Sequence, residues 1–163
     1  MRGDPRPVNQ AEFKHACGRF ATGITIASVR DAAGTPHGLT VNSFTSVSLV
    51  PPLILICLGH AVSVIDAFRQ ATHFGVSILA EDQKKLSERF ARKGHDRFDG
   101  VAWHPGQTGV PLLDGVLGTI ECSCHQRFTS GDHDIVVGEV VHTRICDDAR
   151  PLIYFASHYR SLT

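Results

Sequence analysis

The sequence predicts a mainly β domain of α+β character, in which antiparallel strands form a closed or nearly closed barrel with peripheral helices. Two long β-rich stretches, 116–128 and 135–145, flank a turn cluster at 129–132, which predicts a long hairpin. Several shorter apolar or β-rich segments are separated by turns rich in glycine, proline and aspartate. Helical periodicity is confined to short segments.

Length and charge limit the organisation of the chain and the class of its partners. The chain has 163 residues, which fits one domain over 9–163 after a short N-terminal tail over 1–8. Lysine and arginine number 16, as do aspartate and glutamate, so the formal net charge is zero. This balance argues against nucleic-acid binding, which requires a basic excess, and it permits self-association.

The sequence does not predict membrane insertion, export or a metal site. The longest apolar run, 49–58, is interrupted by Pro51 and Pro52 and is half as long as the roughly 20 residues of a spanning helix. The N-terminus lacks the apolar core of a secretory signal, so we expect a cytoplasmic protein with five reduced cysteines. Cys122 and Cys124 have C-x-C spacing without a second pair, unlike structural zinc sites.

The first half of the chain predicts one helix and several strands. Asn9 and Glu12 have the spacing of a capping box, and apolar residues follow at helical spacing. We therefore expect an amphipathic helix over 9–20 that stops before Gly23. Strands are predicted over 24–29, 37–48 and 53–58, because these segments are β-rich and are separated by turn residues.

The second half predicts two short helices and the remaining strands. Ser63 is placed to cap a short helix through Phe68. Residues 81–91 carry acidic residues first and basic residues later, which suits the helix dipole. Segment 100–111 is rich in glycine and proline and predicts a loop anchored by burial of Trp103. The remaining strands are predicted over 73–79, 116–128, 135–145 and 152–155.

Residues 38–48 form the most unusual segment. Hydroxyl and amide side chains crowd a stretch between apolar strands, with an irregular middle at Asn42 and Ser43. Such a stretch offers small hydrogen-bond donors and a backbone that leaves the sheet to meet a ligand. The alternative, which composition alone favours, is an exposed edge strand whose hydroxyls face water.

Two further segments carry groups that suit a ligand. Segment 89–98 holds several basic residues beside a glycine, which could bind a phosphate or form a solvated helix end. His133 stands between Asp132 and Asp134 at the predicted hairpin tip, where it could orient a ligand or be exposed without a role. The sequence holds no nucleophile elbow, phosphate loop or dinucleotide fingerprint. We assign no catalytic side chain, and this favours chemistry carried by a cofactor.

Five segments, taken in order, resemble the short-chain flavin reductases, which are the NAD(P)H:flavin oxidoreductase components of two-component flavin monooxygenases. The resemblance runs from about residue 13 to residue 160. The segments are Phe20-Ala-Thr-Gly-Ile-Thr25, Gly38 to Ser48 followed by Pro51-Pro52, Phe90 to Phe98, Gly131-Asp-His133 with Val137-Gly-Glu-Val140, and Pro151 to Phe155 with Tyr159-Arg160.

The resemblance implies a split β-barrel that binds flavin at a homodimer interface. It assigns the isoalloxazine ring to Thr40, Val41, Asn42, Ser43, Phe44, Ser46 and Ser48. It assigns the flavin phosphate to Ser63, Lys93 and Arg97, and the nicotinamide to His133, Tyr154 and Arg160.

The implied reaction is reduction of FMN or FAD by NADH or NADPH, with hydride transfer from nicotinamide C4 to flavin N5. The reduced flavin then diffuses to a separate monooxygenase. This transfer needs no protein acid or nucleophile, only two rings held close together.

One departure from the family pattern bears on flavin affinity. Val62 and Val64 stand where the family usually carries hydroxyls, and only Ser63 remains. Each lost hydrogen bond to a charged group costs roughly 1 kcal/mol or more. This departure supports an alternative, a flavin storage or electron-transfer protein of the same fold. A third hypothesis is a β-barrel interaction module without enzymatic activity.

Overall fold

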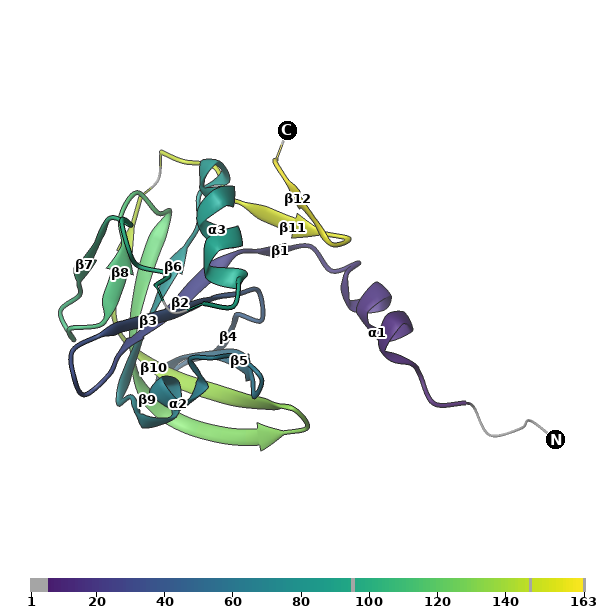
Figure 1. The fold of residues 1–163 in the computed structure, drawn as a ribbon, viewed down its shortest axis with the longest axis horizontal. Helices are drawn as coiled ribbons and strands as arrows, with labels where there is room; N and C mark the ends of the chain where they lie inside the picture. The colour runs from purple at the N-terminus through teal and green to yellow at the C-terminus, as the bar shows by residue number, and fades with distance from the viewer. Residues whose placement is uncertain (1–5, 95, 147, 163) are drawn as a thin grey trace.

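The computed structural model describes residues 6–94, 96–146 and 148–162 (Figure 1). It confirms the mainly β fold class, since strands predominate and three short helices lie outside the main sheet. The helices are α1 (Gln10–Cys17), α2 (Ile65–Gln70) and α3 (Lys84–Ala91), the last preceded by a 3-10 turn at Glu81–Gln83. Residues 1–5 of the predicted tail lie outside the described residues.

A seven-stranded antiparallel sheet forms the body of the molecule. Its strand order is β3-β2-β6-β9-β10-β5-β4. The strands are β2 (Thr25–Arg30), β3 (Pro36–Val41), β4 (Thr45–Leu49), β5 (Pro52–Gly59), β6 (His73–Ile78), β9 (Gly118–Ser130) and β10 (His133–Ile145). A second sheet joins β1 (Thr22–Gly23), β11 (Ile153–Phe155) and β12 (His158–Arg160).

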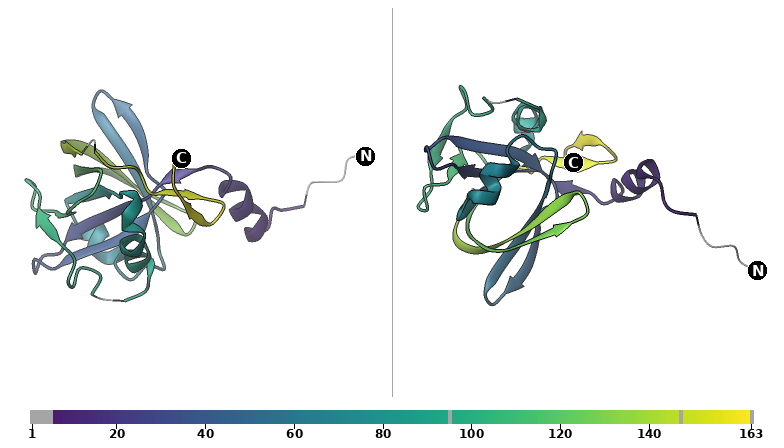
Figure 2. Two further views of the ribbon diagram at one scale, coloured as in Figure 1. Left: turned by 90° about the horizontal axis from the view of Figure 1, so that it is seen from above. Right: turned by 60° about the horizontal axis from the view of Figure 1, so that its bottom comes forward.

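Strands β3 and β4 are the two edges of the main sheet, yet only residues 42–44 separate them in the chain. A flat sheet of seven strands would hold its edges about 29 Å apart, at about 4.8 Å for each strand spacing. The backbone from Val41 to Thr45 spans at most about 14 Å. The sheet therefore curls (Figure 2) into the nearly closed barrel that the sequence predicts, although these two strands do not pair.

Two apolar clusters stabilise this arrangement. Inside the curl, alternate residues of β5 pack with Ile65 and Phe68 of α2. Outside it, Phe90 of α3 packs with Phe98 and Leu152 in a second cluster that fixes α3 against the barrel. Helices α2 and α3 therefore pack against the barrel rather than form a separate layer (Figure 1).

The predicted N-terminal helix and its capping box at Asn9 and Glu12 are present as α1, which buries none of its residues and projects from the body (Figure 1). Two local predictions are wrong. Ser63 does not cap α2, because the residue at the cap is Val64 and no side chain bonds there. The predicted loop at 100–111 contains a short hairpin of β7 (Trp103–Pro105) and β8 (Pro111–Leu113), and Trp103 is only half-buried. The sequence also did not predict β12.

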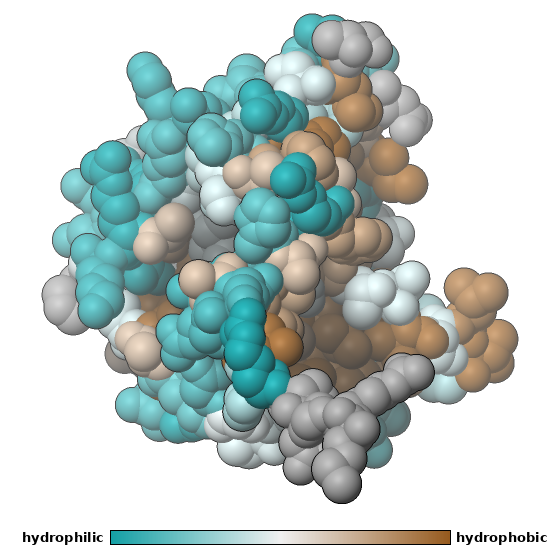
Figure 3. All heavy atoms as spheres, turned by 90° about the vertical axis from the view of Figure 1, so that its right-hand side faces the viewer, coloured by the Kyte–Doolittle hydropathy of each residue, from teal (hydrophilic) through white to brown (hydrophobic). Residues whose placement is uncertain are grey.

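Several large apolar side chains remain exposed. They include Phe13 and Phe20 in and after α1, and Val47, Leu49 and Val50 in β4 and the turn that follows it. Figure 3 shows apolar surface gathered on the side of the molecule from which α1 projects. This surface is larger than isolated apolar residues require and is typical of a protein interface.

Gly138 of β10 provides a test of the packing inside the curl. A Cβ atom at this position would lie 2.5 Å from the ring of Phe74, which is fully buried. We expect Gly138→Ala to lower the free energy of unfolding by about 1–3 kcal/mol through overpacking. Urea unfolding would measure this, with Gly23→Ala as the control because a Cβ there meets nothing within 4 Å. Equal stability of the two variants would contradict this packing.

Candidate functional site

Residues 42–44 leave the sheet between β3 and β4, at the irregular middle that the sequence indicates. Ser43 Oγ accepts from the Cys57 N–H and donates to the Cys57 carbonyl, both at 3.0 Å. One side chain thus supplies both hydrogen bonds that a neighbouring strand would give to this residue of β5. The backbone N–H groups of 42–44 have no acceptor among the described residues. Three consecutive donors are therefore available to a ligand.

A cavity of about 190 Å³ adjoins this segment. It is lined by Ile24, Thr40, Asn42, Ala91, Tyr154 and Tyr159. The cavity thus brings together two residues predicted to bind flavin and one predicted to bind nicotinamide. Pockets that bury most of a small ligand are about 300–1,000 Å³, so one chain encloses only part of such a ligand here.

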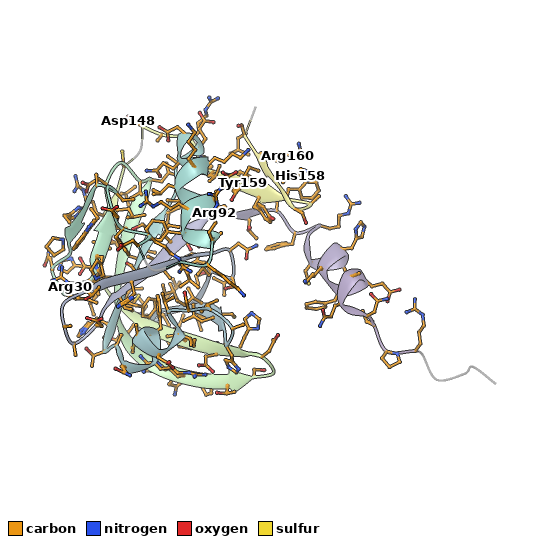
Figure 4. All side chains as sticks on the ribbon, in the orientation of Figure 1. Arg30, Arg92, Asp148, His158, Tyr159 and Arg160 are labelled. Carbon is orange, nitrogen blue, oxygen red and sulfur yellow. The ribbon has the colours of Figure 1, made fainter. Side chains whose placement is uncertain are left out.

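Hydrogen bonds hold the walls of the cavity in place. Thr40 Oγ1 donates to the Ser87 carbonyl at 2.6 Å, which ties the end of β3 to α3. Ser87 Oγ and the Tyr159 hydroxyl lie 3.0 Å apart, which ties α3 to the C-terminal hairpin. The Tyr154 and Tyr159 rings meet edge to face at 5.4 Å. Arg160, predicted for nicotinamide, lies on the same hairpin and is exposed (Figure 4).

Arg97 is a buried positive charge, 8% exposed. Its guanidinium donates to the carbonyls of Arg92 at 3.1 Å and Gly38 at 2.5 Å, and to Ser63 Oγ at 3.3 Å. Within the described ranges it contacts no carboxylate. Burial lowers the pKa of Arg97 from its usual value, although an arginine stays charged at neutral pH. A buried cation without a counter-ion favours an anionic ligand.

The loop after β5 supplies further donors next to Arg97. The N–H groups of Ser63 and Val64 have no acceptor in the part of the chain that the structure describes. Val64 is buried in the first apolar cluster, and Val62 packs against that cluster. These two valine side chains therefore pack in the apolar core. The hydrogen-bond donors of this loop are the Ser63 hydroxyl and the backbone N–H groups, and the Arg97 guanidinium lies beside them. Lys93 is exposed nearby in the chain.

The remaining residues predicted for the flavin ring differ in exposure. The Val41 side chain is buried in the apolar cluster, so only its backbone can reach a ligand. Phe44 packs against the same cluster. Ser46 is exposed and Ser48 half-buried on the edge strand β4. Among the described residues, no group of His, Cys, Asp and Glu side chains is arranged to hold a metal.

His133 is the first residue of β10, at the tip of the β9–β10 hairpin, and this tip lies away from the β11–β12 hairpin that carries Tyr154 and Arg160 (Figure 1). Its Nδ1 contacts the Asp132 carboxylate at 2.7 Å. The expectation that two acids flank the imidazole is wrong, because Asp134 points to the other face of the strand. Asp134 instead binds His60 and Arg69, each at 2.8 Å. Hydrogen bonds from these groups hold the pKa of Asp134 well below its usual range.

Sequence reasoning missed three residues that line the cavity, Ile24, Ala91 and Tyr159, and also Ser87, which bonds to Tyr159. Ser87 and Ala91 are four residues apart on α3 and so share a helix face. Tyr159 stands within a segment that carried the resemblance, but it was not assigned a role. The spacing of the small residues Ser87 and Ala91 could have indicated that this face of α3 borders a cavity.

No described helix has the length and apolarity needed to cross a membrane. The five cysteines are all unpaired thiols in the structure. Burial raises the pKa of Cys122 to about 12, so this thiol is unreactive.

The chain belongs to the flavin reductase like domain family, whose model matches residues 17–163. It is 36% identical over 155 residues to the actinorhodin polyketide dimerase of Streptomyces coelicolor, a match that covers 95% of this chain and 88% of that protein. It is also 36% identical over 154 residues to the reductase component of a 4-nitrophenol 4-monooxygenase/4-nitrocatechol 2-monooxygenase from Rhodococcus opacus. That match covers 94% of this chain and 82% of the relative.

A solved structure shares the fold over almost its whole length. The NADH:FAD oxidoreductase of Streptomyces globisporus C-1027, solved with NAD and FAD fragments, superposes with a TM-score of 0.90 at 34% identity. The match covers 95% of this chain and 93% of that chain. Some curated relatives are longer, and the chain spans 42% of the length of one of them.

The Ser43 hydroxyl tests how the 42–44 segment is held. We expect Ser43→Ala to lower the free energy of unfolding by about 1–2 kcal/mol, because both backbone groups of Cys57 lose their partner. Ser48→Ala, on the adjacent strand, is the control and should change stability by less than about 0.5 kcal/mol. A Ser43→Ala variant as stable as the control would overturn this role.

The charge of Asp134 predicts a pH dependence of stability. A carboxylate whose pKa is depressed in the folded state stabilises it above the usual pKa of about 4, and this contribution is lost as the pH falls. We expect the destabilisation by Asp134→Asn to be largest near neutral pH and to shrink below about pH 4. Urea unfolding of both proteins across this range would measure it. A difference that does not change with pH would contradict the prediction.

Proposed function

We propose that this protein is an NAD(P)H:flavin oxidoreductase that reduces free FMN or FAD and supplies the reduced flavin to a separate monooxygenase. Family membership supports the reaction class, and the Rhodococcus relative, named as a reductase component, supports the monooxygenase partner. The match over 17–163 supports a single domain over 9–163. Dependence on reduced nicotinamide supports a cytoplasmic location.

The observation that carries this proposal is the buried Arg97 guanidinium beside Ser63. It has no carboxylate contact in the described ranges, and it adjoins the N–H groups of Ser63 and Val64. Charge-assisted hydrogen bonds from arginine and backbone N–H groups suit a phosphate. FMN and FAD both carry phosphate, and Lys93 is exposed a few residues before Arg97.

The segment from Thr40 to Phe44 is proposed to bind the flavin ring. Its unpaired N–H groups suit the nitrogen and oxygen atoms of the isoalloxazine edge, and Thr40 and Asn42 line the cavity. Donors at that edge stabilise the negative charge of reduced flavin. Ser46 and Ser48 lie further along β4.

The bound flavin and nicotinamide supply the chemistry, a hydride passing from nicotinamide C4 to flavin N5. The chain's part is to hold the two rings and to limit water between them. Tyr154 and Arg160 on the C-terminal hairpin and His133 on the β9–β10 hairpin are proposed to bind different parts of the nicotinamide nucleotide, since the two hairpins lie apart in one chain. NADH and NADPH both remain candidates for the donor.

We infer that two copies of the chain complete the site. Leu55 and Cys57 lie on the face of β5 opposite the core, and they pair with Val137 and Ile135 of β10. Phe128 extends this apolar face and is 50% exposed. A strand that is apolar on both faces suits a second copy packed against it. The cavity of one chain is also too small to enclose flavin.

Arg97→Lys tests the phosphate assignment. Lysine keeps the charge but loses the planar set of donors, so we expect the KM for FMN to rise about tenfold. The KM for riboflavin, which has no phosphate, should change less than about twofold. Loss of NADH absorbance with each flavin would give both constants. Arg92→Lys is the matched control, because Arg92 is exposed and its backbone carbonyl, which the substitution keeps, accepts from Arg97.

Each result of this experiment bears on a hypothesis. Equal changes in both KM values would remove Arg97 from the phosphate site. Flavin binding by the wild type without NADH oxidation would favour the storage or electron-transfer alternative. Absence of both binding and turnover would refute the proposed function.

A further inference from the structure

The loop after β5 is joined to the tip of the β9–β10 hairpin by His60. The His60 N–H donates to the Asp132 carbonyl at 2.9 Å, and its Nε2 lies 2.8 Å from Asp134 Oδ1. The backbone of His60 thus holds Asp132, and its side chain holds Asp134, at the tip of the hairpin. We call the contacts of His60 with Asp132 and Asp134 the hairpin clamp.

Asp134 anchors this clamp to the body of the protein. Its side chain is 8% exposed, and it accepts from Arg69 Nε of α2 at 2.8 Å and from Thr129 Oγ1 at 3.0 Å. These two bonds already use both carboxylate oxygens. His60 is therefore not required to satisfy a buried charge, and its contribution is to fix the loop against the hairpin.

The clamp determines where the His133 imidazole lies. Neighbouring residues of a strand point to opposite faces, so the inward Asp134 directs His133 outward. His133 pairs with Gly59, and a Cβ on Gly59 would lie 3.4 Å from His133 Nε2. Its Nδ1 is held by Asp132 at 2.7 Å, while Nε2 has no hydrogen-bond partner among the described residues. The ring is held on one side and open to a ligand on the other.

The same loop reaches the proposed phosphate donors. His60 stands at one end, and three residues later Ser63 accepts from Arg97. Displacement of His60 would therefore change the separation between His133 and the flavin-binding part of the site.

We propose that His60 and Asp134 are positioning residues for nicotinamide, acting by fixing the His133 imidazole beside the loop that carries Ser63. This inference rests on the proposed function. Neither side chain needs to touch a substrate, and loss of the clamp weakens nicotinamide binding because the imidazole loses its fixed position.

The test compares steady-state kinetics of His60→Leu, His60→Gln and the wild type. His60→Leu should raise the KM for NADH about five- to tenfold with kcat within about twofold, since the lost interaction is a binding one. His60→Gln keeps a side-chain N–H for Asp134 and should restore most of the affinity. Asp134→Asn, which keeps the shape of the side chain, is a second variant expected to raise the same KM.

A double-mutant cycle separates positioning from simple destabilisation. If His60 acts through His133, His60→Leu should have no further effect on the KM for NADH in a His133→Ala background. His104→Leu is the matched control, because it removes a His–Asp contact of 2.6 Å between β7 and the residue after β8. His104→Leu should leave the KM for NADH and the KM for flavin unchanged.

The outcomes distinguish the two proposals. A wild type without flavin-dependent NADH oxidation refutes the proposed function. An active wild type with His60→Leu unchanged, or with additive effects in the cycle, refutes the positioning role. Parallel losses in kcat and in both KM values, together with a lower melting temperature, would also refute it.

Discussion

The short crossing at residues 42–44 is the constraint on which the rest of the structure depends. It joins the two edges of a seven-stranded sheet, and so the sheet must curl. Cys57 pairs with β10 on one side, and on the side of β4, where the strand pairing ends at Leu55, the Ser43 hydroxyl bonds to its backbone. In the part of the chain that the structure describes, the three backbone N–H groups of the crossing have no acceptor, and Asn42 lines the cavity beside Tyr154 and Tyr159. Fold closure and ligand donors therefore come from one local feature.

The buried charged side chains of this molecule have two kinds of surroundings. Asp134 accepts hydrogen bonds from several donors, Arg69 among them, and so fixes the β9–β10 hairpin. Glu121 accepts from the backbone N–H groups of Gln107 and Thr108 and so fixes the loop that holds them. Among the described residues, Arg97 is bound by two carbonyls and a hydroxyl and by no carboxylate. A charge that is satisfied by the chain itself stabilises structure, whereas one without a counter-ion is suited to a ligand. This difference separates the structural charges from the proposed phosphate site.

The strands and the irregular middle at Asn42 and Ser43 followed from the sequence, because alternation and hydroxyl crowding are local signals. The bonds of Ser43 to Cys57 could not be predicted, since they depend on which strands become the edges of the sheet. The opposite directions of His133 and Asp134 depend on strand register, which flanking charges do not reveal. The exposure of helix α1 could not be predicted either. Apolar residues at helical spacing indicate that a helix has an apolar face, but they do not indicate whether the same chain buries that face.

Amide hydrogen exchange of the purified protein, with and without FMN, tests the central claim most directly. If the unpaired N–H groups of the crossing and of the loop at Ser63 bind flavin, peptides covering 42–44 and 60–64 should exchange more slowly when FMN is present. The short hairpin at 103–113 should be unaffected. Protection confined to that hairpin, or unchanged exchange at 42–44 under conditions where FMN is bound, would contradict the account.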